Sequence, residues 1–410
     1  METIFDVAAC RGQFPSLRRK IDGNPVAYLD GPGGTQIPQS VMEAMMDYYL
    51  QSNANTHGQF AASRETTAVV EAARVAMAAM LGAEDPATIS FGANMTTLNF
   101  SLARAVARSI QPGDEVVVTD LDHDANVAPW LTLAERGAVI RRVPVRSDAT
   151  LDMDAFAGLL NSKTRLVAVG YASNAVGTVN DVYTVRRWTR ELGAWMVLDG
   201  VHFVPHGVVD VKRLDPDFLL CSAYKFFGPH VGVLYSRTGA LAQLNTDRVR
   251  PQRATAPERI ETGTLNHAAL AGVTAAVQFI AGLSPTSGSL RARLVAAMDW
   301  VYAYEHELVD QLYRGLQDMP GIRLYGPPVS GELRAPTLSF TLEGATPETL
   351  ARYLGDKGIY VWDGDFYAIT VIKELGLANR GGLVRVGFAP YNTSNEVERL
   401  LLALSEWKHR

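Results

Sequence analysis

The sequence predicts an α/β protein with a mostly parallel main sheet, followed by a smaller α+β part. Short apolar runs recur through the first two thirds of the chain. Several runs are continuous rather than alternating, as expected for strands buried on both faces. Neighbouring runs begin about 22 to 30 residues apart and helix-like stretches fill the gaps, which is the spacing of βαβ units. After about residue 280 this pattern changes to a long helix and mixed elements.

The first part is expected to contain six strands and helices on both faces of the sheet. The strand candidates are 88–91, 115–119, 139–145, 165–171, 195–198 and 218–221. One helical face carries Leu98, Leu102, Ala105 and Ile110, and a weaker one carries Val182, Trp188 and Leu192.

The last part of the chain is expected to form a second, smaller domain. Its candidates are a helix at 290–316, a strand at 337–342, a helix at 347–357, strands near 358–362 and 383–388, and a helix from 394. We therefore predict a large domain at 31–280, a small domain at 281–410, and an N-terminal segment, 1–30, that packs with the small domain. The polar stretch 246–264 is expected to be a long loop.

Composition and charge narrow the class of protein. Of 410 residues, 47% are hydrophobic and 20% charged, which is ordinary globular usage. A net charge of −5 provides no field to hold a nucleic acid or an anionic membrane. Cys10 and Cys221 are too few for a disulfide framework or a cysteine-rich metal site, and they suit a reducing compartment. With an acidic N-terminus and no long apolar run, we expect no signal peptide, no membrane span and a cytoplasmic location.

Lys225 and Asp199 are the most informative residues, because each follows an apolar strand candidate. They are separated by about one strand–helix repeat, so both are expected at the sheet edge where open parallel sheets bind ligands. A lysine beside aromatic residues can be desolvated and become a nucleophile. Pyridoxal 5′-phosphate (PLP) needs this pair: the lysine forms an imine with the aldehyde, and the aspartate keeps the pyridine nitrogen protonated. The alternatives are a solvated turn lysine and a helix-capping aspartate.

Two further segments fit such a site. The segment SFGANMTTLNFS is a strand, a turn and a helix start, where the amides of Ala93, Asn94 and Met95 and the Thr96 hydroxyl can hold a phosphate. Ordinary helix capping is the alternative. His123 follows another strand and is positioned to stack on a planar ring; otherwise it is a surface turn residue.

Other cofactors fit less well. GPGGTQ at Gly31–Gln36 lacks the third glycine of a dinucleotide loop. His202 and His206 are four apart, but Pro205 interrupts a helix there and no third ligand is placed by spacing. We therefore expect no metal.

Taken together, these residues resemble the class V aminotransferases, which are fold type I PLP enzymes, and especially their cysteine desulfurase branch. The motifs are YLDGPGGT from Tyr28, DHDANVAPW, YASNAVGT, LDGVH, SAYKFFGP, ETGTLN and RVGFAPYNT, so the resemblance spans nearly the whole chain. It implies a large domain with a mostly parallel seven-stranded sheet, a smaller α+β C-terminal domain, and PLP as cofactor.

The resemblance also implies roles for individual residues. Lys225 matches the imine lysine, Asp199 the ring-nitrogen partner and His123 the stacking residue, while His202 lies near the ring hydroxyl. Asn174 contacts cofactor and substrate. Phosphate contacts match Ser222 and Ala93, Asn94, Met95 and Thr96. Thr264 matches a residue that reaches the neighbouring subunit's phosphate, which implies a homodimer with shared sites. Arg385 clamps the substrate carboxylate, and Asn55 and His57 line the mouth of the site.

The departures from that branch bear on the reaction. Tyr367 occupies the position of the desulfurase cysteine, and Trp362 stands where an arginine is usual. GANMTT replaces the usual phosphate turn, and Tyr224 replaces a common histidine before the lysine. Persulfide chemistry by the usual route is therefore in doubt.

The expected function is elimination or replacement at the side chain of a small amino acid, by a desulfurase-like lyase without a persulfide cysteine. Lys225 would remove the α-proton, and Tyr367 would contact a polar substrate side chain together with Asp365. Transamination is the second candidate. The third is epimerisation of the isopenicillin N epimerase type, with Tyr367 or His57 as second base. A decayed PLP-binding scaffold is the non-enzyme alternative.

Overall fold

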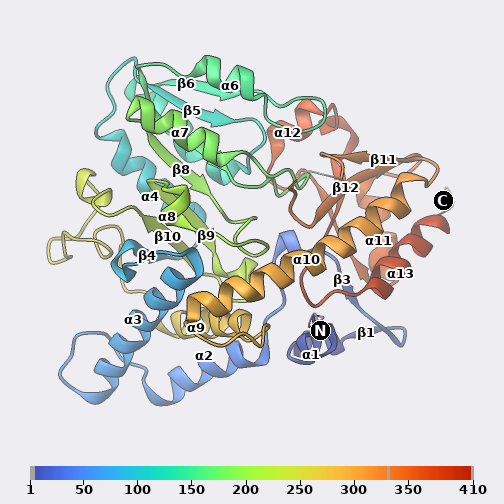
Figure 1. The fold of residues 1–410 in the computed structure, drawn as a ribbon, viewed down its shortest axis with the longest axis horizontal. Coiled ribbons are helices and arrows are strands. Elements are labelled where there is room, and N and C mark those ends of the chain that lie inside the picture. Colours follow the sequence, from blue (N-terminus) through green and yellow to red (C-terminus); the bar gives the residue numbers. More distant parts are fainter. Residues whose placement is uncertain (1–4, 330–332, 408–410) are drawn as a thin grey trace.

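The computed structural model describes residues 5–329 and 333–407. Its main element is a seven-stranded sheet with the order β4–β10–β9–β8–β7–β5–β6 (Figure 1). The strands are β4 (Ile89–Gly92), β5 (Glu115–Thr119), β6 (Val139–Val143), β7 (Thr164–Gly170), β8 (Trp195–Asp199), β9 (Phe218–Ser222) and β10 (Gly232–Ser236). The six predicted strands are confirmed within two residues at each end.

Strand β10 was not predicted, and it makes the sheet mixed. It runs antiparallel to both β4 and β9, whereas β9, β8, β7, β5 and β6 are parallel to one another. The aromatic and Gly-Pro-containing turn before it returns the chain directly beside β9. No crossover helix precedes β10, so it does not show the strand–helix spacing that predicted the other strands.

Helices cover both faces of this sheet, as predicted. Side chains of alternate strand residues pack on one side against α4 (Met95–Ala107). On the other side they pack against α3 (Ala61–Leu81), α7 (Val182–Leu192) and α9 (His267–Ala281). Ile110 lies beyond the end of α4, because the helix stops at Ala107. Neither α3 nor α9 was predicted, since alanine-rich helices show little apolar contrast around their circumference.

The C-terminal part contains a four-stranded antiparallel sheet, β11–β12–β15–β14. The strands are β11 (Ile322–Tyr325), β12 (Thr337–Leu342), β14 (Trp362–Gly364) and β15 (Leu383–Gly387). Helices α10 (Leu290–Gln317), α11 (Pro347–Asp356) and α13 (Ser394–Ser405) contribute to the apolar core beside it. The predicted strand near 358–362 is divided, because β13 (Ile359–Tyr360) leaves this sheet before β14 begins.

The N-terminal segment joins elements that lie far away in sequence. Strand β3 (Ala27–Tyr28) pairs in parallel with β13, and Asp30 forms a bridge to Gly387 at the end of β15. Phe14 meanwhile packs edge-to-face on Phe227 and Phe279 of the main core. The segment therefore contacts both parts of the molecule, and our domain boundaries remain a prediction.

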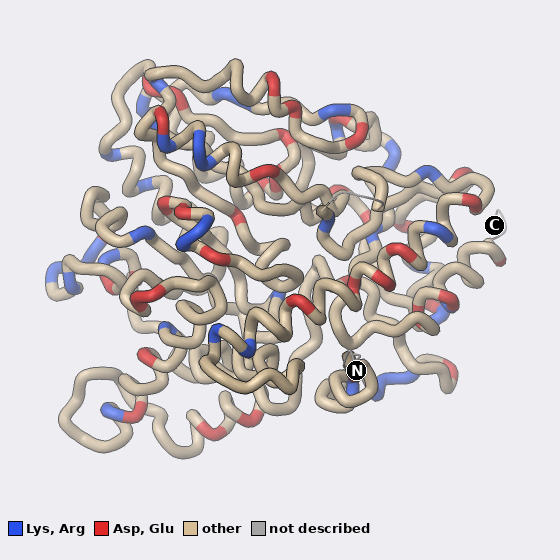
Figure 2. The backbone as a smooth tube through the Cα atoms, viewed as in Figure 1, with Lys and Arg blue, Asp and Glu red and all other residues tan. Residues whose placement is uncertain are grey.

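Two general features complete the fold. Acidic and basic residues are interspersed over both parts of the chain (Figure 2). Among the described residues, no helix has the length and apolarity needed to cross a membrane. The segment 246–264 lies between a short turn at Leu241–Gln243 and α9 and forms the expected loop.

Candidate active site

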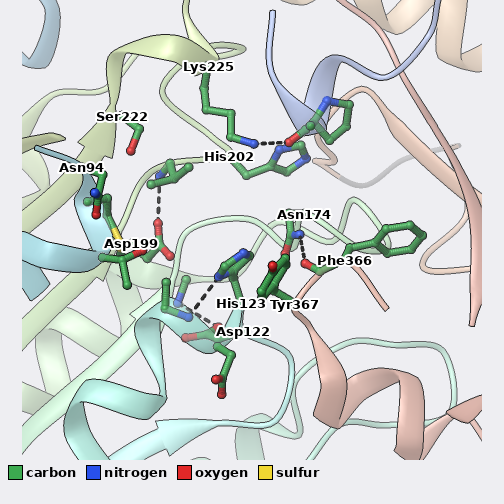
Figure 3. A pocket seen from close by; sticks show the side chains of 18 of the residues that line it. Asn94, Asp122, His123, Asn174, Asp199, His202, Ser222, Lys225, Phe366 and Tyr367 are labelled. Carbon is green, nitrogen blue, oxygen red and sulfur yellow. Dashed lines mark hydrogen bonds between the residues drawn. The ribbon is translucent and has the colours of Figure 1, made fainter. Parts of the chain in front are cut away.

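A cavity of about 580 Å³ lies at the carboxyl ends of the parallel strands of the main sheet (Figure 3). Four of these strands, β5, β7, β8 and β9, end at or just before residues that line it. Eleven of the residues singled out from the sequence line this cavity: Asn94, Met95, Thr96, His123, Asn174, Asp199, His202, Ser222, Lys225, Tyr367 and Arg385.

Asp199 and Lys225 come from neighbouring strands, as the spacing predicted. Asp199 is the last residue of β8, and its Oδ1 accepts a hydrogen bond of 2.9 Å from the Val201 amide. Burial raises the pKa of Asp199 to about 7. Lys225 ends the short turn after β9, and its Nζ donates to the carbonyl of Pro32. Burial, aided by the charge of Arg385, lowers the pKa of Lys225 to about 7.

His123 presents a neutral ring to the cavity. Its Nδ1 accepts a hydrogen bond of 3.0 Å from the Ala125 amide, which fixes the ring proton on Nε2. Burial lowers the pKa of His123 to about 4, so the ring is uncharged at neutral pH. The phenol ring of Tyr367 stacks on it with a centroid separation of 5.5 Å and an angle of 19°. A flat, neutral imidazole of this kind suits stacking on a heteroaromatic ring.

Arg385 is a buried cation without a carboxylate partner within 4 Å in the described part of the chain. It projects from β15, and its Nη1 donates to the carbonyl of Asn174 at 3.0 Å. The guanidinium carbon lies 4.3 Å from the centre of the Phe366 ring. Burial lowers the pKa of Arg385 to about 9, with the charge of Asp30 opposing this effect. A desolvated guanidinium with free donors is well suited to a substrate carboxylate.

The loop that carries Tyr367 has a left-handed backbone conformation at two consecutive residues. Phe366 and Tyr367 both have positive φ angles, 56° and 57°, which non-glycine residues rarely adopt. The carbonyl of Phe366 accepts from Nδ2 of Asn174 at 2.9 Å, and that of Tyr367 accepts from the Asp124 amide at 2.7 Å. Backbone strain held by surrounding contacts is typical of functional sites.

Other predicted residues also line the cavity. Ser222 ends β9, and Asn94 caps α4 by accepting a hydrogen bond from the Thr97 amide at 2.8 Å. His202 is buried, with its Nε2 3.0 Å from the Thr337 hydroxyl. Burial lowers its pKa well below the ordinary value.

Five predicted residues lie outside the cavity: Asn55, His57, Ala93, Thr264 and Asp365. Ala93 is exposed just before α4, and Thr264 is exposed just before α9. His57 borders a separate shallow depression with Gln59 and Arg64. That Thr264 reaches the phosphate of a neighbouring subunit, and that His57 lines the mouth of the site, remain predictions.

Sequence reasoning missed other lining residues, among them Pro32, Phe100, Asp122 and Phe366. Asp122 is a buried carboxylate. The Asn126 amide donates to its Oδ2 at 2.8 Å and the Gly170 amide to its Oδ1 at 3.0 Å, so it ties β5 to β7. The glycine-rich turn that carries Pro32 was considered as a dinucleotide loop and as a family motif, and neither gave Pro32 a place in the site. Only a three-dimensional structure brings it to Lys225.

Neither cysteine lines the cavity. Both are buried free thiols. Burial raises the pKa of Cys10 to about 12, and burial likewise raises the pKa of Cys221. Such thiols carry little thiolate at neutral pH and are poor nucleophiles.

The residues present fit PLP. Lys225 supplies an amine for the aldehyde and Asp199 a carboxylate for the ring nitrogen. The first-turn amides of α4 have no carbonyl partner within the helix, and this turn carries no acidic residue, so it suits a phosphate. Oδ1 of Asn174 is buried and has no hydrogen-bond partner among the described residues, as expected of an acceptor that a bound group completes.

The depressed pKa of Lys225 leads to a test on protein freed of cofactor. Because the folded pKa lies near 7, the neutral amine predominates above that pH, whereas an exposed lysine is still charged there. Labelling of Lys225 by an amine-reactive reagent, followed by peptide mass spectrometry, should rise with a midpoint near pH 7. Labelling of the lysine in a short reference peptide should keep rising towards pH 10. A midpoint at Lys225 that matches the reference peptide would contradict the described environment.

Comparison with known proteins agrees with this geometry. The family model "Aminotransferase class-V" matches residues 27–400. A probable cysteine desulfurase of Vibrio cholerae is 32% identical over 413 residues, covering 98% of each chain. An uncharacterized protein of Mycobacterium tuberculosis is 33% identical and covers 98% of this chain and 99% of its own. A crystal structure of an Escherichia coli cysteine desulfurase superposes with a TM-score of 0.84 at 29% identity, covering 98% of both chains.

The mixed seven-stranded sheet and the cavity at its strand ends define an α/β enzyme of the fold type I, PLP-dependent class. Within that class, the chain belongs to the class V aminotransferase family.

Proposed function

We propose that the protein is a PLP-dependent lyase that eliminates or replaces the β-substituent of a small amino acid without forming a persulfide on the enzyme. The observation that carries this proposal is the composition of the cavity. Lys225, Asp199 and Arg385 line it, and neither Cys10 nor Cys221 does. The cavity thus has the groups for amino-acid chemistry at the α-carbon but no thiol to receive sulfur.

The cofactor would be held by groups from several elements. Lys225 would bind its aldehyde carbon covalently, Asp199 its ring nitrogen, and His123 one face of its ring. Ser222 and the start of α4 (Asn94, Met95 and Thr96) would hold the phosphate, and His202 would lie near the ring hydroxyl. When bound, PLP withdraws electrons from the α-carbon of the substrate.

The chain's own side chains supply binding and proton transfer. Arg385 would bind the substrate carboxylate, and the unpartnered Oδ1 of Asn174 would accept a hydrogen bond from the substrate or cofactor. Lys225 is suited to act as general base, since the lowered pKa leaves much of the amine neutral near pH 7. It would take the α-proton on Nζ.

Product analysis with L-cysteine tests the proposal. Elimination breaks the Cβ–S bond, and hydrolysis of the released product gives pyruvate, ammonia and sulfide in equal amounts. Desulfuration through an enzyme persulfide gives alanine instead. Alanine formation, or sulfur recovered on either cysteine by mass spectrometry, would overturn the proposal.

The same assay separates the other candidates. Keto acid formed only beside an amino acceptor indicates transamination, and appearance of the D-enantiomer indicates epimerisation. Tyr367 stands at the mouth with His123 and is the residue to examine as a second base in that case. A visible cofactor band that no amino acid alters would indicate a scaffold.

We also propose a homodimer with shared sites. Helix α2 (Gln39–Gln51) exposes an apolar stripe of Met42, Met46, Tyr49 and Leu50, spaced as one helical face. The loop after it carries His57, and α9, which packs on α2, follows Thr264. Burying this stripe against a second copy would bring both residues towards an interface.

The double substitution Met46→Glu and Tyr49→Glu is expected to halve the mass measured by light scattering, because it would bury charges in the interface. Leu402→Glu on α13 is the matched control, since Leu402 is an exposed apolar residue on a different helix. A wild-type monomer, or a double variant of unchanged mass, would contradict the dimer.

A further inference from the structure

Aromatic side chains border the mouth of the cavity. Trp362 and Tyr367 line it and remain 52% and 72% exposed, and Phe366 lies buried beside them. They come from β14 and the loop that follows it. Exposed apolar surface that borders a cavity in this way can mark a ligand-binding groove.

Trp362 and Phe366 surround the proposed carboxylate clamp. Trp362 pairs directly with Arg385 across β14 and β15, so their side chains leave the same face of the sheet. A methyl group at Gly33 would lie 3.6 Å from Cε3 of Trp362 and 3.7 Å from Nη2 of Arg385, so both groups border the same glycine. The Phe366 ring covers the guanidinium at 4.3 Å. An amino acid bound by Arg385 therefore has aromatic rings within reach of its side chain.

Charge around the mouth favours a neutral side chain. Among the described residues that line the cavity, Lys225 and Arg385 are the only lysine or arginine. Both are already engaged in the proposed reaction, so no cation remains for a second carboxylate. Asp124 also lines the cavity, so a cationic side chain is the alternative to exclude by experiment.

We propose that this aromatic mouth, formed by Trp362, Phe366 and Tyr367, selects cysteine S-conjugates whose sulfur carries an apolar or aromatic substituent. The inference rests on the proposed lyase function and names its substrate class. In the reaction, Lys225 takes the α-proton, the Cβ–S bond breaks, and its electron pair leaves on sulfur, which takes a proton to become a free thiol. Water then converts the remaining three-carbon product to pyruvate and ammonia. No thiol on the enzyme takes part.

A substrate panel with a common sulfur linkage tests the selection. We expect kcat/KM for S-phenyl-L-cysteine to exceed that for L-cysteine by about tenfold, since aromatic contact is gained only by the former. S-carboxymethyl-L-cysteine and S-(2-aminoethyl)-L-cysteine should react more slowly than S-phenyl-L-cysteine. Equilibrium titration of the visible cofactor band should show tighter binding of L-phenylalanine, which has no leaving group, than of L-aspartate.

Two substitutions at Trp362 sharpen the test. Trp362→Ala should lower the preference for S-phenyl-L-cysteine over L-cysteine about tenfold, and Trp362→Arg should shift the preference towards S-carboxymethyl-L-cysteine. Tyr183→Ala, at an exposed aromatic residue on α7, should leave the preference unchanged.

The outcomes separate this inference from the function beneath it. Elimination from all members of the panel at similar rates, with affinities that the Trp362 substitutions do not change, would overturn the substrate class. It would not contradict the lyase function. A preference for S-(2-aminoethyl)-L-cysteine would overturn the proposed substrate class and indicate that Asp124 binds a cationic side chain. Failure of every member to yield pyruvate would overturn the lyase itself.

Discussion

Lys225→Ala is expected to lower turnover of amino acids by about 10²–10⁴-fold, because the variant loses the proposed general base. It should also lose the covalent link to the cofactor. Borohydride treatment followed by peptide mass spectrometry should fix a pyridoxyl group on the wild-type peptide that contains residue 225, and none on the variant.

The control for this substitution is Lys163→Ala, at an exposed lysine. Circular dichroism should show that both variants fold, since Lys225 contributes one hydrogen bond to Pro32 and little apolar packing. Full activity of the alanine variant, or a pyridoxyl group on another lysine, would remove the basis of the mechanism.

Arg385→Lys is expected to raise KM for amino acids by about 10- to 100-fold, with a smaller change in kcat. Lysine keeps a positive charge but loses the planar pair of donors that binds a carboxylate in two places. It also loses the contact with Asn174 and the stacking on Phe366. Titration of the visible cofactor band measures the change as a loss of affinity.

A ligand control shows whether the carboxylate is responsible. Binding of a simple amine without a carboxylate should be the same in the wild type and in Arg385→Lys. Arg380→Lys, at an exposed arginine five residues earlier, should behave as the wild type. Equal losses of affinity for the amine and the amino acid would mean that Arg385 shapes the cavity and does not bind the carboxylate.

Much of the main sheet and its site was predictable because both follow short-range rules. Continuous apolar runs identified the buried parallel strands, and the polar residues that follow some of these runs, such as Asp199 and Lys225, identified the cavity edge. Asp199 and Lys225 were placed together by their spacing alone. Strand β10 could not be found in this way, since it follows a turn and no crossover helix.

The parts that were missed depend on contacts between distant segments. Pro32 reaches Lys225 only because β3 pairs with β13 and Asp30 with Gly387. The left-handed backbone of Phe366 and Tyr367 is equally invisible in sequence, because neither residue type favours it. Asn174 and Asp124 hold that loop from the main-sheet side.

The pairing of β3 with β13 also affects the order in which the chain can fold during its synthesis. The two strands are separated by most of the polypeptide, so a nascent chain contains Lys225 and Asp199 long before β13 is available to pair with β3. Until residues near 385 have left the ribosome, the lysine amine lacks both its final surroundings and its guanidinium neighbour. Chains that terminate early would therefore contain Lys225 without Arg385, the residue proposed to bind the substrate carboxylate.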